Sequence, residues 1–213
     1  MNTKDKIMES SLALFARKGF AGVSVREIAR EVGVRESALY KHFKNKQDIL
    51  DCIMTDMKER ISKAYVDNQV PEAVSEDIAK GYQEMSQEDL CEMSWRLFQV
   101  FTKDPVVSEY RKLLMREQFV NAEAAKLYSS LFLRGVIDKQ KLTFESLVLG
   151  GVFREEESEI IALHFYAPIL LLFQQYDCQP EQETQIKDLL FRHVRAFGRN
   201  YGSYHEMRDL KDV

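Results

Sequence analysis

SVREIAREVGVRESALYKHF, residues 24–43, decides the fold of the N-terminal part of this 213-residue chain. The stretch has the pattern of two short helices joined by a tight turn. Ser24 followed three residues later by Glu27 is a capping box, which opens a helix. Gly33 is expected to end that helix, because glycine adopts the left-handed conformation at a helix C-terminus without steric cost. Apolar residues recur between these two points at helical spacing and predict one buried face: Val25, Ile28, Ala29 and Val32.

The second half of the stretch has one apolar and one polar face. Leu39 and Phe43 form an apolar pair four residues apart. The polar face consists of Glu36, Ser37, Tyr40, Lys41 and Lys44. Two helices that cross through a glycine-containing turn are the helix-turn-helix of DNA-binding proteins. An ordinary helical hairpin in an α-helical core has the same local pattern, so the stretch by itself leaves both interpretations open.

The charge of the chain is divided unevenly. Residues 1–50 contain ten Lys and Arg and six Asp and Glu, a net charge of +4. The other 163 residues contain twenty and twenty-eight, a net charge of −8. A basic N-terminal segment on an acidic protein favours contact between that segment and a polyanion such as DNA.

The composition predicts a cytoplasmic, nearly all-α protein. Only four prolines and nine glycines interrupt the chain, and 45% of its residues are hydrophobic. The longest strongly apolar stretch, residues 162–173, is too short for a membrane span, which takes about 20 apolar residues. The charged N-terminus lacks the apolar segment of a secretory signal. Three widely separated cysteines are expected to be reduced thiols: Cys52, Cys91 and Cys178.

Periodic apolar residues predict a series of helices and two domains. The expected helices are residues 4–18 (with Thr3 as N-cap), 46–68, 71–84, 86–103, 105–119, 122–139, 156–176 and 180–201. The segment 141–151 is predicted to be a loop with a short turn of helix. A boundary near residue 47 divides a helix-turn-helix domain, 1–47, from a larger α-helical regulatory and dimerisation domain, 48–213.

The last two predicted helices are the most apolar part of the chain. The first of them is apolar on nearly all sides and contains Pro168, which is expected to kink it. Two adjacent helices with so much apolar surface suggest a self-complementary dimer face, and burial within one subunit is the alternative. The residues expected at a dimer interface are Ile160, His164, Ala167, Leu171, Leu190, Val194 and Phe197.

Aromatic residues in the middle helices are numerous enough to line a ligand cavity. Such cavities are mostly apolar and contain a few polar groups. Core packing alone would use the same residues. The residues expected to contact a small molecule are Trp95, Phe98, Phe119, Tyr128, Phe132 and Tyr166.

Catalytic and cofactor motifs are missing from the sequence. It contains no phosphate-binding glycine loop, no G-x-S-x-G nucleophile motif and no pair of histidines beside a glutamate on a helix. His164 and His193 lie on the two apolar C-terminal helices, where hydrogen-bonded histidines are favoured over a metal pair because no carboxylate or cysteine has ligand spacing. We therefore expect no catalysis, no metal and no cofactor.

Residues 7–50 closely resemble the N-terminal domain of the TetR family of transcriptional regulators. The residues that carry the resemblance are Leu14-Phe15, Gly19-Phe20, Val25-Arg26-Glu27-Ile28-Ala29, Gly33-Val34, Leu39-Tyr40, His42-Phe43 and Lys46. The resemblance implies an all-α homodimer in which the last two helices of each subunit form a four-helix bundle. It also implies a repressor that binds a palindromic double-stranded operator and releases it when a small-molecule effector enters the C-terminal domain.

Carried onto this chain, the resemblance makes residues 36–42 a recognition helix in the major groove. Base contacts are expected from Arg26, Arg35, Glu36, Ser37, Ala38 and Lys41, and phosphate contacts from Ser24, Tyr40, His42 and Lys46. Arg35 and Ala38 stand where many members have a hydroxyl side chain, so this chain is expected to read its own operator sequence. The alternative is a helical scaffold or binding module that no longer binds DNA, because Glu36 would face an anionic groove.

Overall fold

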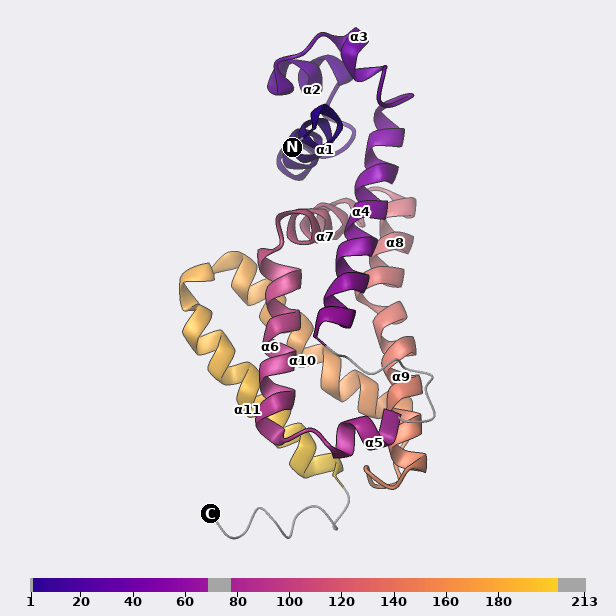
Figure 1. Cartoon of the computed structure of the whole chain (residues 1–213), viewed down its shortest axis with the longest axis vertical. Helices are drawn as coiled ribbons and strands as arrows, with labels where there is room; N and C mark the ends of the chain where they lie inside the picture. The colour runs from indigo at the N-terminus through magenta and orange to yellow at the C-terminus, as the bar shows by residue number, and fades with distance from the viewer. Residues whose placement is uncertain (1, 69–77, 203–213) are drawn as a thin grey trace. The chain divides into compact units, whose positions relative to one another are not determined.

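The computed structural model describes residues 2–68 and 78–202 (Figure 1). Within these residues the regular elements are α-helices, apart from the 3-10 helix η1, Pro180–Gln182, so the all-α prediction is confirmed. The helices are α1 Thr3–Lys18, α2 Val25–Val32, α3 Glu36–Leu39, α4 Lys46–Asp67, α5 Ile78–Gln83, α6 Gln87–Lys103, α7 Pro105–Glu117, α8 Ala122–Phe132, α9 Arg134–Leu149, α10 Ser158–Cys178 and α11 Glu183–Tyr201. The predicted helix start at Pro71 lies outside the described residues.

The chain divides into two compact units. The first comprises Met1–Ala64 and Lys103–Ser129, and the second comprises Tyr65–Thr102 and Ser130–Val213. The predicted boundary near residue 47 falls in the first turn of α4, inside the first unit.

In the first unit, α1 begins one residue earlier than predicted. Asn2, not Thr3, is the N-cap: its side chain accepts a hydrogen bond from the backbone N–H of Asp5 at 2.9 Å, and the Asp5 carboxylate accepts one from the backbone N–H of Asn2 at 3.3 Å. Gly19 ends α1, with φ 77° and an N–H donated to the carbonyl of Phe15 at 2.8 Å. The ring of Phe20 then turns back onto the ring of Phe15, with centroids 5.1 Å apart.

In the second unit, the structure corrects the predicted loop at residues 141–151. Residues 141–149 are the second half of α9, and the predicted helix 122–139 instead breaks at Leu133. Ile137, Phe144 and Leu147 are buried on one face of α9. These three residues lie on both sides of the predicted boundary between helix and loop. Their helical spacing is therefore not visible in the predicted helix or in the predicted loop taken separately.

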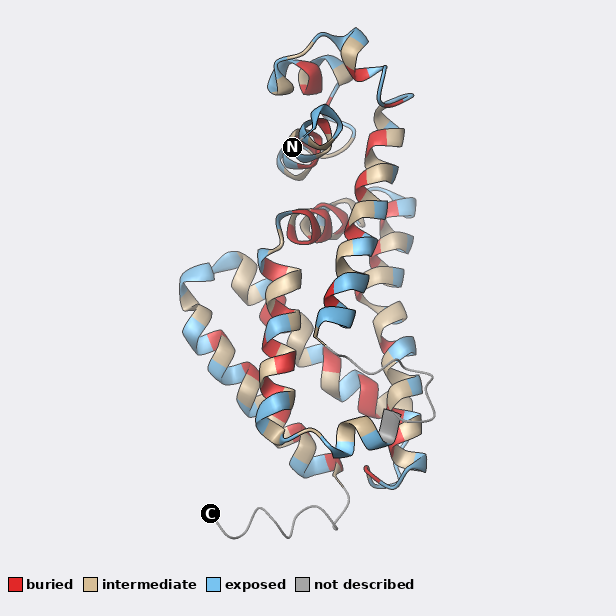
Figure 2. Ribbon diagram, in the orientation of Figure 1, coloured by how far each residue is buried: buried red, intermediate tan, exposed pale blue. Residues whose placement is uncertain are grey.

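The two long helices at the end of the chain, α10 and α11, contribute most of the core of the second unit (Figure 1). Buried and exposed residues alternate along both helices, as expected of helices that face both a core and solvent (Figure 2). Helix α10 continues through Pro168. The buried residues of α11 recur every three or four positions: Ile186, Leu190, Val194, Phe197 and Tyr201.

The backbone passes unusually close to itself at the junction of α8 and α9. A Cβ atom on Gly135 would lie 1.8 Å from the carbonyl oxygen of Ser130.

Gly135→Ala is therefore expected to lower the free energy of unfolding by about 3 kcal/mol or more, because the backbone must shift to relieve the contact. Gly198→Ala in the interior of α11 is the matched control: its Cβ would meet only ordinary van der Waals contact, and the change should stabilise the protein by about 0.5–1 kcal/mol. Urea denaturation followed by circular dichroism measures both, and equal midpoints for the two variants would contradict this account.

Candidate nucleic-acid interface

The start of α2 is fixed by its cap and by an ion pair. The hydroxyl of Ser24 accepts a hydrogen bond from the backbone N–H of Glu27 at 3.2 Å. The carboxylate of Glu27 forms an ion pair with Lys18 at the end of α1. The pKa of Glu27 is lowered, first by the hydrogen bond from Lys18 and also by the backbone N–H of Ser24. The Ser24 half of the predicted capping box is therefore present, and the ion pair of Glu27 with Lys18 connects α2 to α1.

The turn between α2 and α3 closes through glycine, as predicted. Gly33 has φ 77° and ψ 31°, the left-handed conformation. Its N–H is donated to the carbonyl of Arg30 at 3.2 Å, and the N–H of Val34 is donated to the carbonyl of Ala29 at 2.9 Å. These bonds satisfy carbonyls at the end of α2 and reverse the chain toward α3.

Helix α3 is shorter than the predicted recognition helix, residues 36–42. It spans Glu36–Leu39, and the chain continues as a turn in which the N–H groups of His42 and Phe43 are donated to the carbonyl of Leu39 at 3.0 and 3.1 Å. Its N-cap is Arg35, whose side chain makes no capping hydrogen bond, as expected from the missing hydroxyl. Leu39 and Phe43 are buried and anchor this segment within the first unit.

Most of the predicted DNA-contacting side chains are exposed on the same part of the first unit. The exposed ones are Ser24, Arg26, Arg35, Glu36, Ser37, Tyr40, Lys41 and His42, whereas Ala38 and Lys46 are half-buried. A hollow of about 740 Å³ lies between α2 and α3, and we refer to it as the α2–α3 hollow. Three arginines line it: Arg26, Arg30 and Arg35. The sequence prediction omitted Arg30, although its place four residues after Arg26 puts it on the same face of α2.

Lys46, predicted to contact phosphate, makes structural contacts. Its ammonium donates hydrogen bonds to the carbonyls of Phe20 at 2.7 Å and Val23 at 2.8 Å, and it lies 4.3 Å from the centroid of the Phe20 ring. Burial lowers the pKa of Lys46. We call this arrangement the Lys46 contact. It fixes the loop between α1 and α2, and a phosphate contact by the third N–H of the ammonium remains a prediction.

The six predicted ligand-contacting residues are divided between the two units. Four lie in the second unit among packed aromatic rings: Trp95, Phe98, Phe132 and Tyr166. The rings of Trp95 and Phe98 stack with centroids 5.3 Å apart, and the hydroxyl of Tyr166 is donated to the carbonyl of Phe132 at 2.9 Å. Tyr128 is buried in the first unit, and Phe119 is 83% exposed in the turn after α7.

The predicted dimer residues separate by helix. Leu190, Val194 and Phe197 on α11 are buried in the core of the second unit, and a contact of these three with a second subunit stays a prediction. Most apolar residues of α11 lie in one row, which its own unit covers. On α10, His164, Ala167 and Leu171 are exposed and Ile160 is half-buried.

Within residues 2–68 and 78–202, no helix combines the length and the apolar character needed to cross a membrane. In the same residues, no three His, Cys, Asp or Glu side chains gather in a way that would hold a metal ion.

Comparison with known proteins gives a family match at the N-terminus and a relative that is similar over most of the chain. Residues 7–53 match the family model described as "Bacterial regulatory proteins, tetR family". The chain is 25% identical over 186 residues to "Probable HTH-type transcriptional regulator YttP" of Bacillus subtilis (strain 168), which covers 87% of this chain and 82% of that protein.

Two solved structures share the fold over nearly the whole chain. The complex of SmeT with triclosan has a TM-score of 0.68 at 18% identity and covers 96% of this chain and 93% of that one. SmeT is described as the repressor of the Stenotrophomonas maltophilia multidrug efflux pump SmeDEF. FadR from Bacillus subtilis, in complex with stearoyl-CoA, has a TM-score of 0.60 at 17% identity and covers 90% and 96% of the two chains.

The Lys46 contact predicts different behaviour for two lysines of this surface. Lys46→Gln should lower the free energy of unfolding by about 1–3 kcal/mol, because the carbonyls of Phe20 and Val23 lose their donor. Lys41→Gln, at an exposed position, should leave stability within about 0.5 kcal/mol of the parent protein. Because Lys41 is predicted to contact a base edge, its removal should also weaken DNA binding by about 1–3 kcal/mol and relax discrimination at one base pair. Equal stability of both variants in urea denaturation would show that the Lys46 contact does not stabilise the loop.

Proposed function

Because residues 7–53 match the tetR family model and the chain is similar to a transcriptional regulator over most of its length, we propose that it is a TetR-family regulator, a cytoplasmic repressor that binds a palindromic operator as a homodimer and releases it when a small molecule binds. The observation that carries the proposal is the α2–α3 hollow, where Arg26, Arg30 and Arg35 gather beside a short exposed helix. Such a surface supplies both the positive charge that attracts phosphates and the side chains that read base edges.

The side chains around the α2–α3 hollow suggest individual roles. Arg26 can make the two-bonded contact with guanine, and the carboxylate of Glu36 can accept a hydrogen bond from the amino group of cytosine. Ala38 offers a methyl contact to thymine. Tyr40, 53% exposed, and His42 follow α3 and can donate to phosphates on the flanking backbone.

A dimer face is supported by the exposed apolar residues of α10. Leu163 is 47% exposed and Leu171 is 65% exposed, and Ala167 lies between them on the same side of the helix. Leu189 on α11 is 41% exposed. We call Leu163, Ala167, Leu171 and Leu189 the apolar stripe. A second copy of the chain that covers this stripe would remove its large apolar side chains from water and place two recognition helices on one duplex.

A small-molecule effector is supported by the ring cluster of the second unit. Trp95, Phe98, Phe132 and Tyr166 provide aromatic faces together with one hydroxyl, the composition typical of a site for a mostly apolar ligand. The names of two relatives of the same fold report bound small molecules, triclosan for SmeT and stearoyl-CoA for FadR. We propose that the effector of this chain enters among these rings and weakens operator binding through the first unit.

DNA binding is tested with duplex DNA from the region upstream of the chain's own gene. The protein should bind a palindrome there with an affinity that falls as salt rises. Arg26→Ala should cost about 1–3 kcal/mol and relax discrimination at one base pair of each half-site. Fluorescence anisotropy with singly substituted duplexes measures both effects. Arg17→Ala, an exposed arginine at the end of α1, is the control and should leave base discrimination unchanged. Absence of binding at low salt would favour a scaffold that no longer binds DNA.

The proposed dimer face is tested by replacing exposed leucines with glutamate. Leu163→Glu combined with Leu171→Glu should convert the protein to a monomer at micromolar concentration, because two carboxylates per subunit would have to be buried in the interface. Leu149→Glu at the end of α9, an 83% exposed leucine outside the apolar stripe, should remain dimeric. Light scattering gives the masses. A dimer in the double variant, with unchanged helical content, would show that another surface mediates association.

A further inference from the structure

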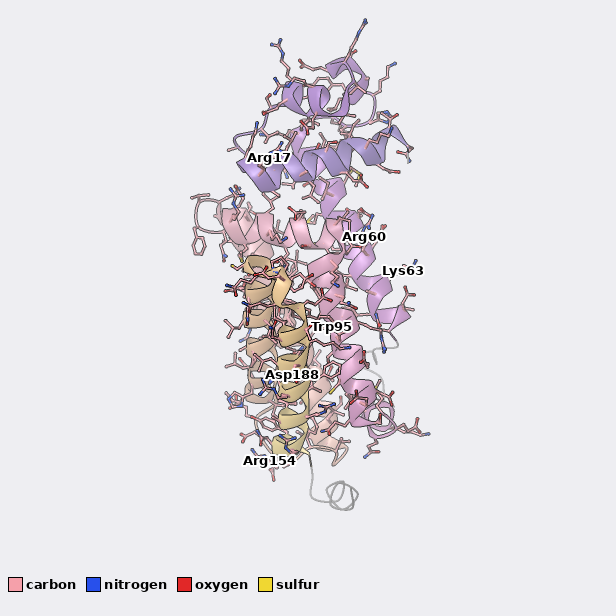
Figure 3. All side chains as sticks on the ribbon, turned by 90° about the vertical axis from the view of Figure 1, so that its left-hand side faces the viewer. Arg17, Arg60, Lys63, Trp95, Arg154 and Asp188 are labelled. Carbon is pink, nitrogen blue, oxygen red and sulfur yellow. The ribbon has the colours of Figure 1, made fainter. Side chains whose placement is uncertain are left out.

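Helix α7 is far from the helix-turn-helix in the sequence but belongs to the same compact unit, where it packs against α1. Its buried side chains include Tyr110, Leu113 and Leu114. Figure 3 shows Arg17 of α1 and Arg60 of α4 near opposite ends of α7, the pink helix that crosses the view below α1. The contacts at these two ends determine how α7 holds α1 and α4.

The start of α7 is bound to α4 through one carboxylate. Oδ1 of Asp104 accepts hydrogen bonds from the backbone N–H groups of Val106 and Val107 at 2.9 and 3.0 Å, so Asp104 is the N-cap. Oδ2 of the same side chain accepts a hydrogen bond from the guanidinium of Arg60 at 3.2 Å. Asp56, one turn earlier on α4, pairs with that guanidinium at 3.1 Å and orients it. We call the bond between α4 and the cap of α7 the Arg60–Asp104 contact.

The end of α7 is bound to α1. The guanidinium of Arg116 donates a hydrogen bond to the carbonyl of Ala16, in the last turn of α1. Carbonyls in the last turn of a helix have no partner within the helix, so a donor from another element satisfies this one. Between the two ends, the buried hydroxyls of Ser11 on α1 and Tyr110 on α7 have no hydrogen-bond partner among the described residues. The ends of α7 therefore supply directional contacts that these hydroxyls do not.

Together with the Lys46 contact, these bonds connect α1, α4 and α7 in a closed ring. Lys46 joins α4 to the loop that follows α1, Arg60 joins α4 to α7, and Arg116 joins α7 to α1. Because hydrogen bonds weaken steeply as their distance and angle change, α1 cannot rotate against α4 without weakening at least one of the three. The ion pair of Glu27 with Lys18 extends this constraint from α1 to α2.

We propose that Arg60 and Asp104 are positioning residues for operator binding: they hold α7, and through it α1, in the orientation that presents α2 and α3 to the duplex. The inference rests on the proposed function, because it concerns how the same surface binds DNA. Arg60 is not itself assigned to a phosphate, since Asp56 and Asp104 both pair with its guanidinium. A dimer reads two half-sites at a fixed separation, so a loss of orientation acts once in each subunit.

Asp104→Asn separates the two roles of this side chain. Asparagine and aspartate are equally good N-caps, so the cap of α7 is kept and the charge that pairs with Arg60 is lost. Exchange of backbone amide hydrogens, followed by mass spectrometry on the full-length protein without DNA, should become about threefold faster or more in α1 and α2. Exchange in α10 and α11 should not change. Arg60→Gln should have the same effect, and the double variant should add little to either single change, because both remove one contact.

Operator affinity is the second measurement. Fluorescence anisotropy should show binding weaker by about threefold to tenfold in Asp104→Asn and in Arg60→Gln, the size expected for a partly exposed ion pair. The slope of log affinity against log salt should stay the same, because no phosphate contact is removed. Lys126→Gln is the control in both measurements: it removes an exposed ion pair with Glu123 at 2.8 Å in the same unit and should behave like the parent protein.

Three results would overturn this inference alone: unchanged exchange in α1 and α2 in both variants, faster exchange throughout both units, or full operator affinity in both variants. The second would assign the Arg60–Asp104 contact a general role in stability. A reduced salt slope in Arg60→Gln would also overturn it, by making Arg60 a phosphate ligand. Absence of DNA binding by the parent protein would instead contradict the proposed function together with this inference.

Discussion

The Lys46 contact is the interaction on which the DNA-facing surface of the first unit depends. Lys46 is the first residue of α4, and its ammonium reaches back to the carbonyls of Phe20 and Val23. The residue after Val23 is Ser24, the N-cap of α2, so the contact fixes the point at which α2 begins. Helix α3 follows α2 through the Gly33 turn and is only four residues long. Such a short helix has no stability of its own, so its position is determined by α2 and by the buried side chains of Leu39 and Phe43.

Local chemistry explains why the sequence predicts this part of the fold well. Gly19 and Gly33 end helices because their positive φ angles exclude most other residues, and Asn45 begins α4 by accepting the N–H of Asp48. These signals involve neighbours in the sequence and need no knowledge of the fold. The predicted cap of α1 differs from the observed one by a single residue, because Asn2 and Thr3 are both good caps and only the backbone conformation distinguishes them.

Tertiary packing explains what the sequence does not predict. In α9, the helical period becomes visible only once residues 134–149 are taken as one element. In the site, the charge of Lys46 suggests a phosphate contact, but two backbone carbonyls distant in the sequence occupy its ammonium. The spacing of Arg30 to Arg26 is sufficient to predict that Arg30 lies on the same surface. The contacts of Lys46 cannot be predicted in this way, because no residue near Lys46 in the sequence identifies the carbonyls that its ammonium contacts.

The same reasoning accounts for the division of roles between the last two helices. Most apolar residues of helix α11 lie in one row that the core of its own unit covers. Helix α10 is apolar on nearly all sides. Because the core of the unit covers only one side, where Ile161 and Phe173 are buried, Leu163 and Leu171 on another side stay exposed. An exposed apolar face is a liability for a monomer, which makes α10 the source of the surface that a second copy would cover. His164 and His193 interrupt this otherwise apolar region with oriented polar groups, so a second copy that docks there must satisfy specific hydrogen bonds as well as bury carbon.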